Sequence, residues 1–281
     1  MTENKKVVLP PGPIGVFDSG YGGLTILENI RKTLPQYDYI YLGDNARTPY
    51  GTRSFDVVYQ YTWECVKKLF DMGCHLVILG CNTASAKALR SIQQNDLLTY
   101  NSGRRVLGVI RPTVEGLDEV TQNKHVGIFA TPGTVQSNSY PLEIHKLFPD
   151  IKISSEACPM WVPLIENNEH LTKGAEYFVQ QHIDNLLQKD PEIDTIILGC
   201  THYPLILPTI KKFLPEHIKV ISQGEIVAAS LKTYLQNHPP MEKKCTTNGS
   251  IVYYTTETVE KFTGVASIFL NETIEAQHIQ L

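Results

Sequence analysis

The chain has 281 residues, is 42% hydrophobic and carries a formal net charge of −4. That length and apolar content can bury the core of one large domain or two medium ones. The negative charge and the lack of a long Lys or Arg run argue against nucleic acid or an anionic membrane as a partner. No apolar run approaches the roughly 20 residues of a membrane span, and the stretch Met1–Pro13 lacks the apolar core of a secretion signal.

The six cysteines show no CxxC spacing and are too sparse for a disulfide scaffold. Reduced thiols in a cytoplasmic protein are the simplest interpretation, and we expect a cytoplasmic location.

The first part of the chain predicts strands that alternate with helices. Each strand is a short apolar run, and each helix shows apolar residues at helical spacing. This alternation is typical of an α/β fold with parallel sheets covered on both faces. The predicted elements are strands at Ile14–Phe17, Tyr39–Leu42 and Val77–Leu79, and helices at Leu24–Leu34, Phe55–Met72 and Ala84–Leu97.

The second part repeats the plan of the first. Val126–Phe129 echoes Ile14–Phe17 at an offset of 112 positions (126 − 14), and Gly199-Cys200 echoes Gly80-Cys81 at an offset of 119 (200 − 81). Agreement of order and spacing predicts two related, pseudo-symmetric α/β halves. The further predictions are strands near Ile151–Ser154, Lys219–Ile221 and a last strand at Gly249–Thr255; helices at Thr172–Lys189, Leu205–Leu214 and Glu225–Leu235; a loop at Pro239–Asn248; and a structured tail.

Polar stretches follow the predicted strands in both halves. Ligands of open α/β sheets bind beyond the carboxyl ends of the strands, so we expect these stretches to converge on one cleft if the halves face each other. The stretches are Asp18-Ser19, Pro49–Gly51, Cys81–Thr83, Thr131–Thr134 and Cys200–His202.

The cysteine pair carries the strongest chemical signal. Each cysteine ends a strand and begins a helix, where the positive helix terminus is expected to lower a thiol pKa. A single buried cysteine is more often a small core residue. Two thiols on opposite walls of a cleft, however, are what stereochemical inversion at carbon needs, because one removes a proton and the other returns one to the far face. The sequence therefore favours Cys81 and Cys200 as a catalytic pair.

Neighbouring polar residues have a functional and a structural interpretation. His202 could exchange a proton with Cys200 or fill a hydrogen bond in a loop. Asp18 could hold a substrate ammonium, orient Cys81 or cap a helix, and these roles are compatible. Short donors near helix N-termini could cradle a carboxylate, although each one alone is more often a cap; they are Ser19, Asn82, Thr83 and Thr201.

Cofactor signals are weak. The loop Gly20–Gly23 starts like a dinucleotide motif, but Thr25 stands where its third glycine belongs. No Cys, His or carboxylate set has metal spacing, and no lysine sits in a strand-end loop where a pyridoxal Schiff base would form. We expect neither a cofactor nor a metal.

The strand-end motifs resemble those of the bacterial glutamate racemases, in the same order from about Ile14 to Gly224. Aspartate racemases share the two-cysteine plan but differ in the first motif and after each cysteine; His202-Tyr203 and Ala84-Ser85 favour the glutamate enzymes. The motifs are Asp18–Leu24, Asp44–Gly51, Cys81–Ser85, Cys158–Glu166 and Gly199–Leu205.

The resemblance implies a cofactor-independent racemase that interconverts L- and D-glutamate and supplies D-glutamate for peptidoglycan. Cys81 would take the α-proton of D-glutamate and Cys200 that of L-glutamate, with Asp18, Glu166 and His202 assisting. The implied substrate-binding set is Asp18, Ser19, Pro49, Tyr50, Gly51, Asn82, Thr83, Thr131, Thr134, Thr201 and His202.

The family architecture implies two domains, the first formed by residues 1–108 and 222–281 and the second by residues 109–221, and a homodimer. This chain departs from the family pattern twice. Tyr21 is bulkier than the small aliphatic residue expected there, and Ser222–Gly224 replaces a stretch that resembles Asp-Ser-Gly.

Three classes of function stay open from the residues alone. The preferred one is a glutamate racemase, with another amino-acid racemase, such as one for aspartate, as the near alternative. A Cys-His hydrolase or acyl-transfer enzyme would use Cys200 and His202 and give Cys81 no task. A non-catalytic amino-acid-binding module would dispense with both thiols.

Overall fold

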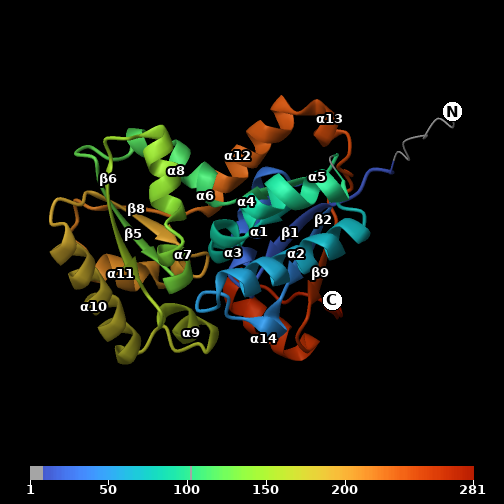
Figure 1. The fold of residues 1–281 in the computed structure, drawn as a ribbon. Helices are drawn as coiled ribbons and strands as arrows, with labels where there is room; N and C mark the ends of the chain where they lie inside the picture. Colours follow the sequence, from blue (N-terminus) through green and yellow to red (C-terminus); the bar gives the residue numbers. More distant parts are fainter. Residues whose placement is uncertain (1–8, 102) are drawn as a thin grey trace.

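The computed structural model describes residues 9–101 and 103–281 and shows two parallel β-sheets covered by helices (Figure 1). The first sheet has the order β10 (Ala276–His278), β9 (Ile251–Thr255), β2 (Tyr39–Gly43), β1 (Ile14–Asp18), β3 (Leu76–Leu79) and β4 (Arg105–Gly108). The second has the order β6 (Lys152–Ala157), β5 (His125–Ala130), β7 (Thr195–Gly199) and β8 (Lys219–Ile221).

The two sheets share one strand order, which confirms the predicted pseudo-symmetric α/β halves. The order β2-β1-β3-β4 in the first sheet matches β6-β5-β7-β8 in the second, and every strand pair is parallel. The sequence echoes fall on equivalent strands, since β1 corresponds to β5 and β3 to β7. These four strands are almost wholly buried, as the unbroken apolar runs of parallel strands require.

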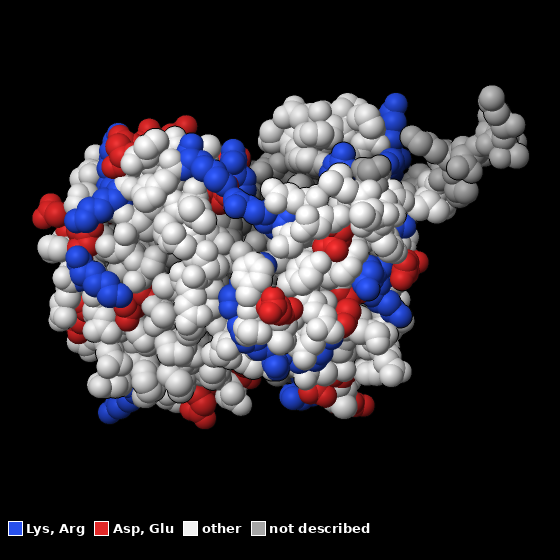
Figure 2. Space-filling view, viewed as in Figure 1, with Lys and Arg blue, Asp and Glu red and all other residues white. Residues whose placement is uncertain are grey.

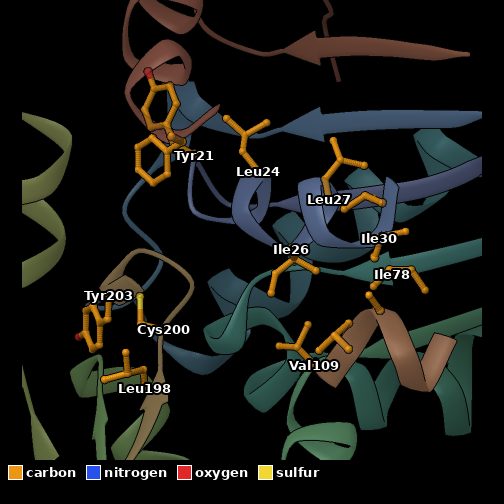
Figure 3. Close-up of a cluster of buried hydrophobic side chains, with 14 of the residues drawn as sticks. Tyr21, Leu24, Ile26, Leu27, Ile30, Ile78, Val109, Leu198, Cys200 and Tyr203 are labelled. Atoms are coloured by element: carbon orange, nitrogen blue, oxygen red, sulfur yellow. The ribbon is translucent and has the colours of Figure 1, made fainter. Parts of the chain in front are cut away.

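The long helices lie where the sequence predicts them. They are α1 (Gly23–Thr33), α2 (Phe55–Asp71), α10 (Lys173–Lys189) and α12 (Gly224–Asn237), and the structured tail contains α14 (Val259–Leu270). Helix α1 packs against α12 and α14. Figure 3 shows Ile26 of α1 directed toward Val109, and both side chains are buried. Each such aliphatic side chain stabilises the fold by about 1.5–3 kcal/mol relative to its exposed state.

The helix predicted from about Ala84 to Leu97 is wrong in its continuity. Helix α3 (Asn82–Lys87) begins two residues earlier, because the Cys81 sulfur caps it by accepting the backbone N–H of Ala84. The chain then forms α4 (Leu89–Ser91), a π-helical turn at Ile92–Asp96 and α5 (Leu97–Tyr100). Apolar spacing did not reveal this change.

Three further differences concern short elements. The predicted loop Pro239–Asn248 begins with the short helix α13 (Pro239–Glu242). Proline is tolerated at the first position of a helix, so Pro239 does not prevent this turn. Strand β4 was not predicted, and Gly249–Thr255 is not the last strand, because β10 follows it. Strand β10 is polar and lies at the sheet edge, so its sequence has no apolar pattern to detect.

The chain passes between the sheets twice. The first crossing leaves β4 and runs through α6 (Ile110–Glu115) to β5; the second leaves β8 and runs through α12 to β9. Four shorter helices cover the second half: α7 (Pro132–Gln136), α8 (Ser139–Leu147), α9 (Trp161–Glu166) and α11 (Leu207–Phe213).

Charges of both signs are interspersed over the face in Figure 2. Arg90 reaches Glu143 of α8 with an N···O distance of 3.4 Å, so an ion pair links the two halves here, and Arg111 of the first crossing reaches the same carboxylate at 3.5 Å. Among the described residues, none of the helices is both long and apolar enough to span a membrane.

Candidate active site

The two cysteines lie at equivalent strand ends and share one cavity. Cys81 follows β3 and Cys200 follows β7, both at the point where the strand order reverses, which is where ligands of such sheets bind. The cavity has a volume of about 20 Å³. Its lining residues are Ser19, Thr48, Pro49, Tyr50, Cys81, Asn82, Thr83, Thr131, Val162, Cys200, Thr201 and His202.

Most of the predicted site residues therefore converge. Four of them do not line the cavity but contact residues around it: Asp18, Gly51, Thr134 and Glu166. Two lining residues, Thr48 and Val162, were missed. Thr48 directly precedes the predicted Pro49, and Val162 lies within the segment that ends at Glu166, so the loop motifs were the only signal for them.

Cys81 carries its proton at neutral pH. Its sulfur lies 3.2 Å from the Ser19 hydroxyl and accepts the Ala84 N–H at 3.4 Å. Burial and the neighbouring Asp18 carboxylate nevertheless raise the pKa of the Cys81 thiol to about 12. The expectation of a lowered pKa is wrong for this cysteine, because desolvation outweighs the helix terminus.

Asp18 is fully buried at the end of β1. It is not the N-cap of α1, which is Gly22, but its Oδ2 accepts the Gly20 N–H at 2.9 Å. Its Oδ1 has no hydrogen-bond partner within the part of the chain that the structure describes. Burial raises the pKa of Asp18, and the nearby His202 and the backbone N–H groups of Gly20 and Gly23 offset part of that shift. This oxygen is a spare acceptor beside Cys81.

Cys200, His202 and Glu166 form a chain of contacts. The Cys200 sulfur lies 3.7 Å from His202 Nδ1, and His202 Nε2 lies 2.9 Å from Glu166 Oε1. Burial alone would lower the pKa of His202, but its bonds to Cys200 and Glu166 raise it well above the ordinary value. The protonated ring places a positive charge next to the Cys200 sulfur.

Close approach of the halves depends on Gly22. A Cβ atom at this position would lie 2.3 Å from Thr201 Oγ1 and 2.4 Å from His202 Nδ1. No side chain fits there while the loop after β7 keeps its place. On the other side, Thr83 Oγ1 meets Thr131 Oγ1 at 2.9 Å, and Gly133 N donates to Gly51 O at 2.7 Å.

The bulky Tyr21 has a packing role. Its ring stacks on Phe262 and Phe269 of α14, with centroid separations of 5.7 and 6.0 Å. Phe269 in turn meets the His202 ring edge-on at 5.4 Å. Helix α14 therefore supports the loop after β7, and in Figure 3 Cys200 and Tyr203 of that loop lie side by side.

Two candidate substrate-binding side chains are engaged elsewhere. The Tyr50 hydroxyl donates to Asp44 Oδ2, so only its ring borders the cavity. The Asn82 amide bonds to Tyr140 and Gln223. Among the described residues, there is no group of three or more His, Cys, Asp and Glu side chains that could hold a metal ion.

A larger hollow of about 590 Å³ lies between α3, α6, α8 and α12 but includes neither Cys81 nor Cys200. We assign the chemistry to the small cavity because the reactive groups converge there. Two thiols that reach one cavity from different halves, with a carboxyl near one and an imidazolium beside the other, can remove a proton from one face of a carbon and supply a proton to the other face.

Two parallel α/β halves with a thiol at each equivalent strand end define a class of cofactor-free racemases, and comparisons with known proteins agree. The chain belongs to the Asp/Glu/hydantoin racemase family, whose model matches residues 14–231.

Individual relatives are similar over nearly their whole length. A glutamate racemase of Roseobacter denitrificans is 40% identical over 272 residues, which cover 93% of this chain and 98% of that protein. A glutamate racemase crystal structure from Bacillus anthracis superimposes with a TM-score of 0.87 at 36% identity, over 96% of this chain and 98% of that one. A glutamate racemase structure from Francisella tularensis, in complex with D-glutamate, superimposes with a TM-score of 0.85 at 34% identity. The match covers 96% of this chain and 98% of that one.

Proposed function

We propose that the protein is a glutamate racemase that interconverts L- and D-glutamate without a cofactor. The observation that carries the proposal is the pair of thiols, Cys81 and Cys200, facing one cavity from equivalent strands. The similarity to glutamate racemases over more than nine-tenths of the chain supports glutamate as the substrate.

In the proposed reaction one sulfur removes the α-proton and the other sulfur supplies a proton to the opposite face. For L-glutamate, the Cys200 thiolate takes the α-proton and becomes a thiol, leaving a planar carbanion. The Cys81 thiol then gives its own proton to the opposite face and becomes a thiolate. The reverse reaction starts with the Cys81 thiolate. No net proton is gained or lost, and the returned proton comes from the enzyme.

Neighbouring groups assist each sulfur in this proposal. The His202 imidazolium, held by Glu166, stabilises negative charge on Cys200. Ser19 bonds the Cys81 sulfur, and Asp18 offers its spare Oδ1 to the substrate ammonium or to the proton of Cys81. Hydroxyl and backbone donors around the cavity bind the two carboxylates; those hydroxyls belong to Ser19, Thr83, Thr131 and Thr201.

The substrate must open the site to enter. A cavity of about 20 Å³ holds about one water molecule, far less than glutamate. Thr83 and Thr131 line this cavity and contact each other across the halves, and the Gly51–Gly133 contact lies next to Thr131, so we infer that both contacts separate when substrate enters. The closed form excludes water from the carbanion.

The biological setting belongs to the same proposal. The enzyme supplies D-glutamate for peptidoglycan in the cytoplasm, acts as a homodimer, and has two domains, residues 1–108 with 222–281 and residues 109–221. Molar-mass measurement by light scattering tests the dimer, and a mass of one chain of 31.6 kDa would contradict it.

The decisive experiment is incubation of pyridoxal-free protein with L-glutamate in D₂O, with chiral analysis and α-deuterium content followed together. We expect D-glutamate carrying solvent deuterium. Cys81→Ala and Cys200→Ala should each lower racemisation at least 10²–10⁴-fold. Cys245→Ala, which removes a buried thiol remote from the cavity, is the control. Absence of α-exchange with glutamate would refute the proposal, and exchange with aspartate instead would change the substrate.

One observation favours a second candidate, a hydrolase or acyl-transfer enzyme. The order Cys200, His202, Glu166 is that of a nucleophile, a base and an orienting carboxylate. Such an enzyme would keep its activity in Cys81→Ala and form a covalent acyl intermediate on Cys200. Loss of racemisation in both cysteine variants, with no such intermediate by mass spectrometry, excludes it.

A further inference from the structure

A closed network of hydrogen bonds lies directly behind the active site. Asn82 Nδ2 donates to Gln223 Oε1 at 2.6 Å, and the Tyr140 hydroxyl donates to Asn82 Oδ1 at 2.7 Å. Gln223 Nε2 donates to the Tyr140 oxygen at 2.8 Å and to Thr113 Oγ1 at 2.9 Å. All four side chains are at most 3% exposed.

These four residues come from four separate places in the chain. Asn82 begins α3 directly after Cys81, Thr113 lies in α6 on the first crossing, Tyr140 lies in α8 of the second half, and Gln223 is the N-cap residue of α12 on the second crossing. Gln223 therefore joins both crossings to the helix that carries the Cys81 loop.

Hydrogen-bond accounting shows what the network does to Asn82. An amide has two N–H donors and one oxygen with two acceptor sites. One donor is held by Gln223, while the oxygen accepts the Tyr140 hydroxyl and faces Gln223 Nε2 at 3.2 Å. One N–H remains for a ligand. Asn82 can then meet a substrate carboxylate only as a donor.

Without Gln223 the Asn82 amide loses the acceptor that fixes its orientation. It can rotate by half a turn and present its oxygen, which repels a carboxylate. A buried group without its partner is costly, so a new arrangement with water or Tyr140 would replace the present one. The sign of the dipole that faces the cavity is set by Gln223 together with the Tyr140 hydroxyl, which donates to the Asn82 oxygen.

We propose that Gln223 is a positioning residue that fixes the Asn82 amide as a carboxylate donor, an inference that rests on the proposed function. The Gln223 amide reaches both Asn82 and Thr113, so this one side chain links the crossings to the active-site helix.

The test compares Gln223→Met with Thr113→Val. Methionine keeps the volume of Gln223 and removes its polar atoms, whereas valine at 113 removes another arm of the network that does not touch Asn82. Asn82 binds the carboxylate in the ground state and the transition state alike, so we expect Gln223→Met to raise KM for glutamate about tenfold or more, with a smaller change in kcat. Thr113→Val should lower Tm and leave KM unchanged.

Tyr140→Phe adds a double-variant cycle. It removes the donor to Asn82 Oδ1, so its effect on KM should be less than additive with that of Gln223→Met. Equal KM values in Gln223→Met and Thr113→Val, or a loss of Tm with no change in KM, would show that Gln223 serves stability alone and overturn the inference.

A readout independent of catalysis separates this inference from the proposed function. In the unsubstituted protein the Asn82 side-chain amide protons should give two distinct NMR signals with slow solvent exchange, and Gln223→Met should lose this protection. If that loss occurs while glutamate is not racemised, the proposed function has failed and the positioning of Asn82 stands. Retained protection in Gln223→Met refutes the positioning role.

Discussion

The carboxylate of Glu166 holds the imidazole of His202 from 36 positions away, with 2.9 Å between Oε1 and Nε2. Glu166 ends α9 and His202 follows β7, so the pair is made entirely by the packing of the second half. The contact turns Nδ1 toward the Cys200 sulfur and raises the pKa of the buried ring. Burial alone would keep His202 neutral, but its contacts with Glu166 and Cys200 make the ring cationic.

Glu166→Gln should lower the pKa of His202, because the amide cannot stabilise the imidazolium as a carboxylate does. The folded-state pKa of His202 lies above the ordinary histidine value of 6.5. The stabilisation is therefore fully present below pH 6.5 and is lost as the pH rises through the folded-state pKa. We expect a loss of about 1.5–3 kcal/mol at pH 6 that shrinks at high pH.

NMR titration of His202 and unfolding at a series of pH values measure this change. Glu169→Gln, a nearby exposed carboxylate, is the control. A His202 titration curve that is the same in Glu166→Gln and in the unsubstituted protein would contradict the role of the contact.

Asp18→Asn should stabilise the fold and weaken the enzyme. The raised pKa of Asp18 means that ionising it costs stability, and that cost grows as the pH rises above the unfolded value of 3.8. The asparagine variant should therefore gain Tm at neutral pH and lose that gain below pH 4. Its activity should fall roughly 10- to 100-fold, since a charged acceptor is lost. Calorimetry with parallel kinetics checks both parts, and a lower Tm at pH 7 would count against the pKa assignment.

Cys81 should react slowly with iodoacetamide. With a pKa of about 12, roughly one thiol in 10⁴ is ionised at pH 8, and the rate should rise about tenfold per pH unit up to that value. Asp18→Asn should speed the reaction, because the carboxylate raises the thiol pKa. Cys245, with a pKa also raised to about 12 but no contact with Asp18, should be unaffected. Peptide mapping by mass spectrometry follows both sites, and equal Cys81 rates in the two proteins would exclude the Asp18 effect.

Gly22→Ala should abolish most activity through a steric clash. The added methyl overlaps Thr201 and His202, so the loop after β7 must shift. Such overpacking costs about 1–3 kcal/mol of stability, and a misplacement of about 1 Å can cost 10²-fold in rate. Gly264→Ala lies in helix α14, where no atom of the described residues comes within 4 Å of the new methyl. This variant should keep activity and gain up to about 1 kcal/mol of stability. Full activity in Gly22→Ala would show that the loop has room to adjust.

The sequence by itself determined the α/β class, the pairing of the halves and the two thiols. Parallel strands buried on both faces must be apolar throughout, so β1, β3, β5 and β7 stand out as runs, and the echo of Gly80-Cys81 in Gly199-Cys200 marks equivalent strand ends. Periodicity also located the long helices, because their buried faces repeat every turn.

Only the tertiary structure decided the protonation state and the hydrogen-bond partners of each site residue. Burial beside Asp18 raises the pKa of Cys81 against the expectation from its helix terminus, because the cost of desolvation depends on everything packed around the sulfur. The partners of Asn82 come from residues 58 and 141 positions away. Strand-end motifs predict that such groups lie near one another. Long-range packing decides which atoms form hydrogen bonds, because hydrogen bonds and charge interactions depend on separations of a few ångströms.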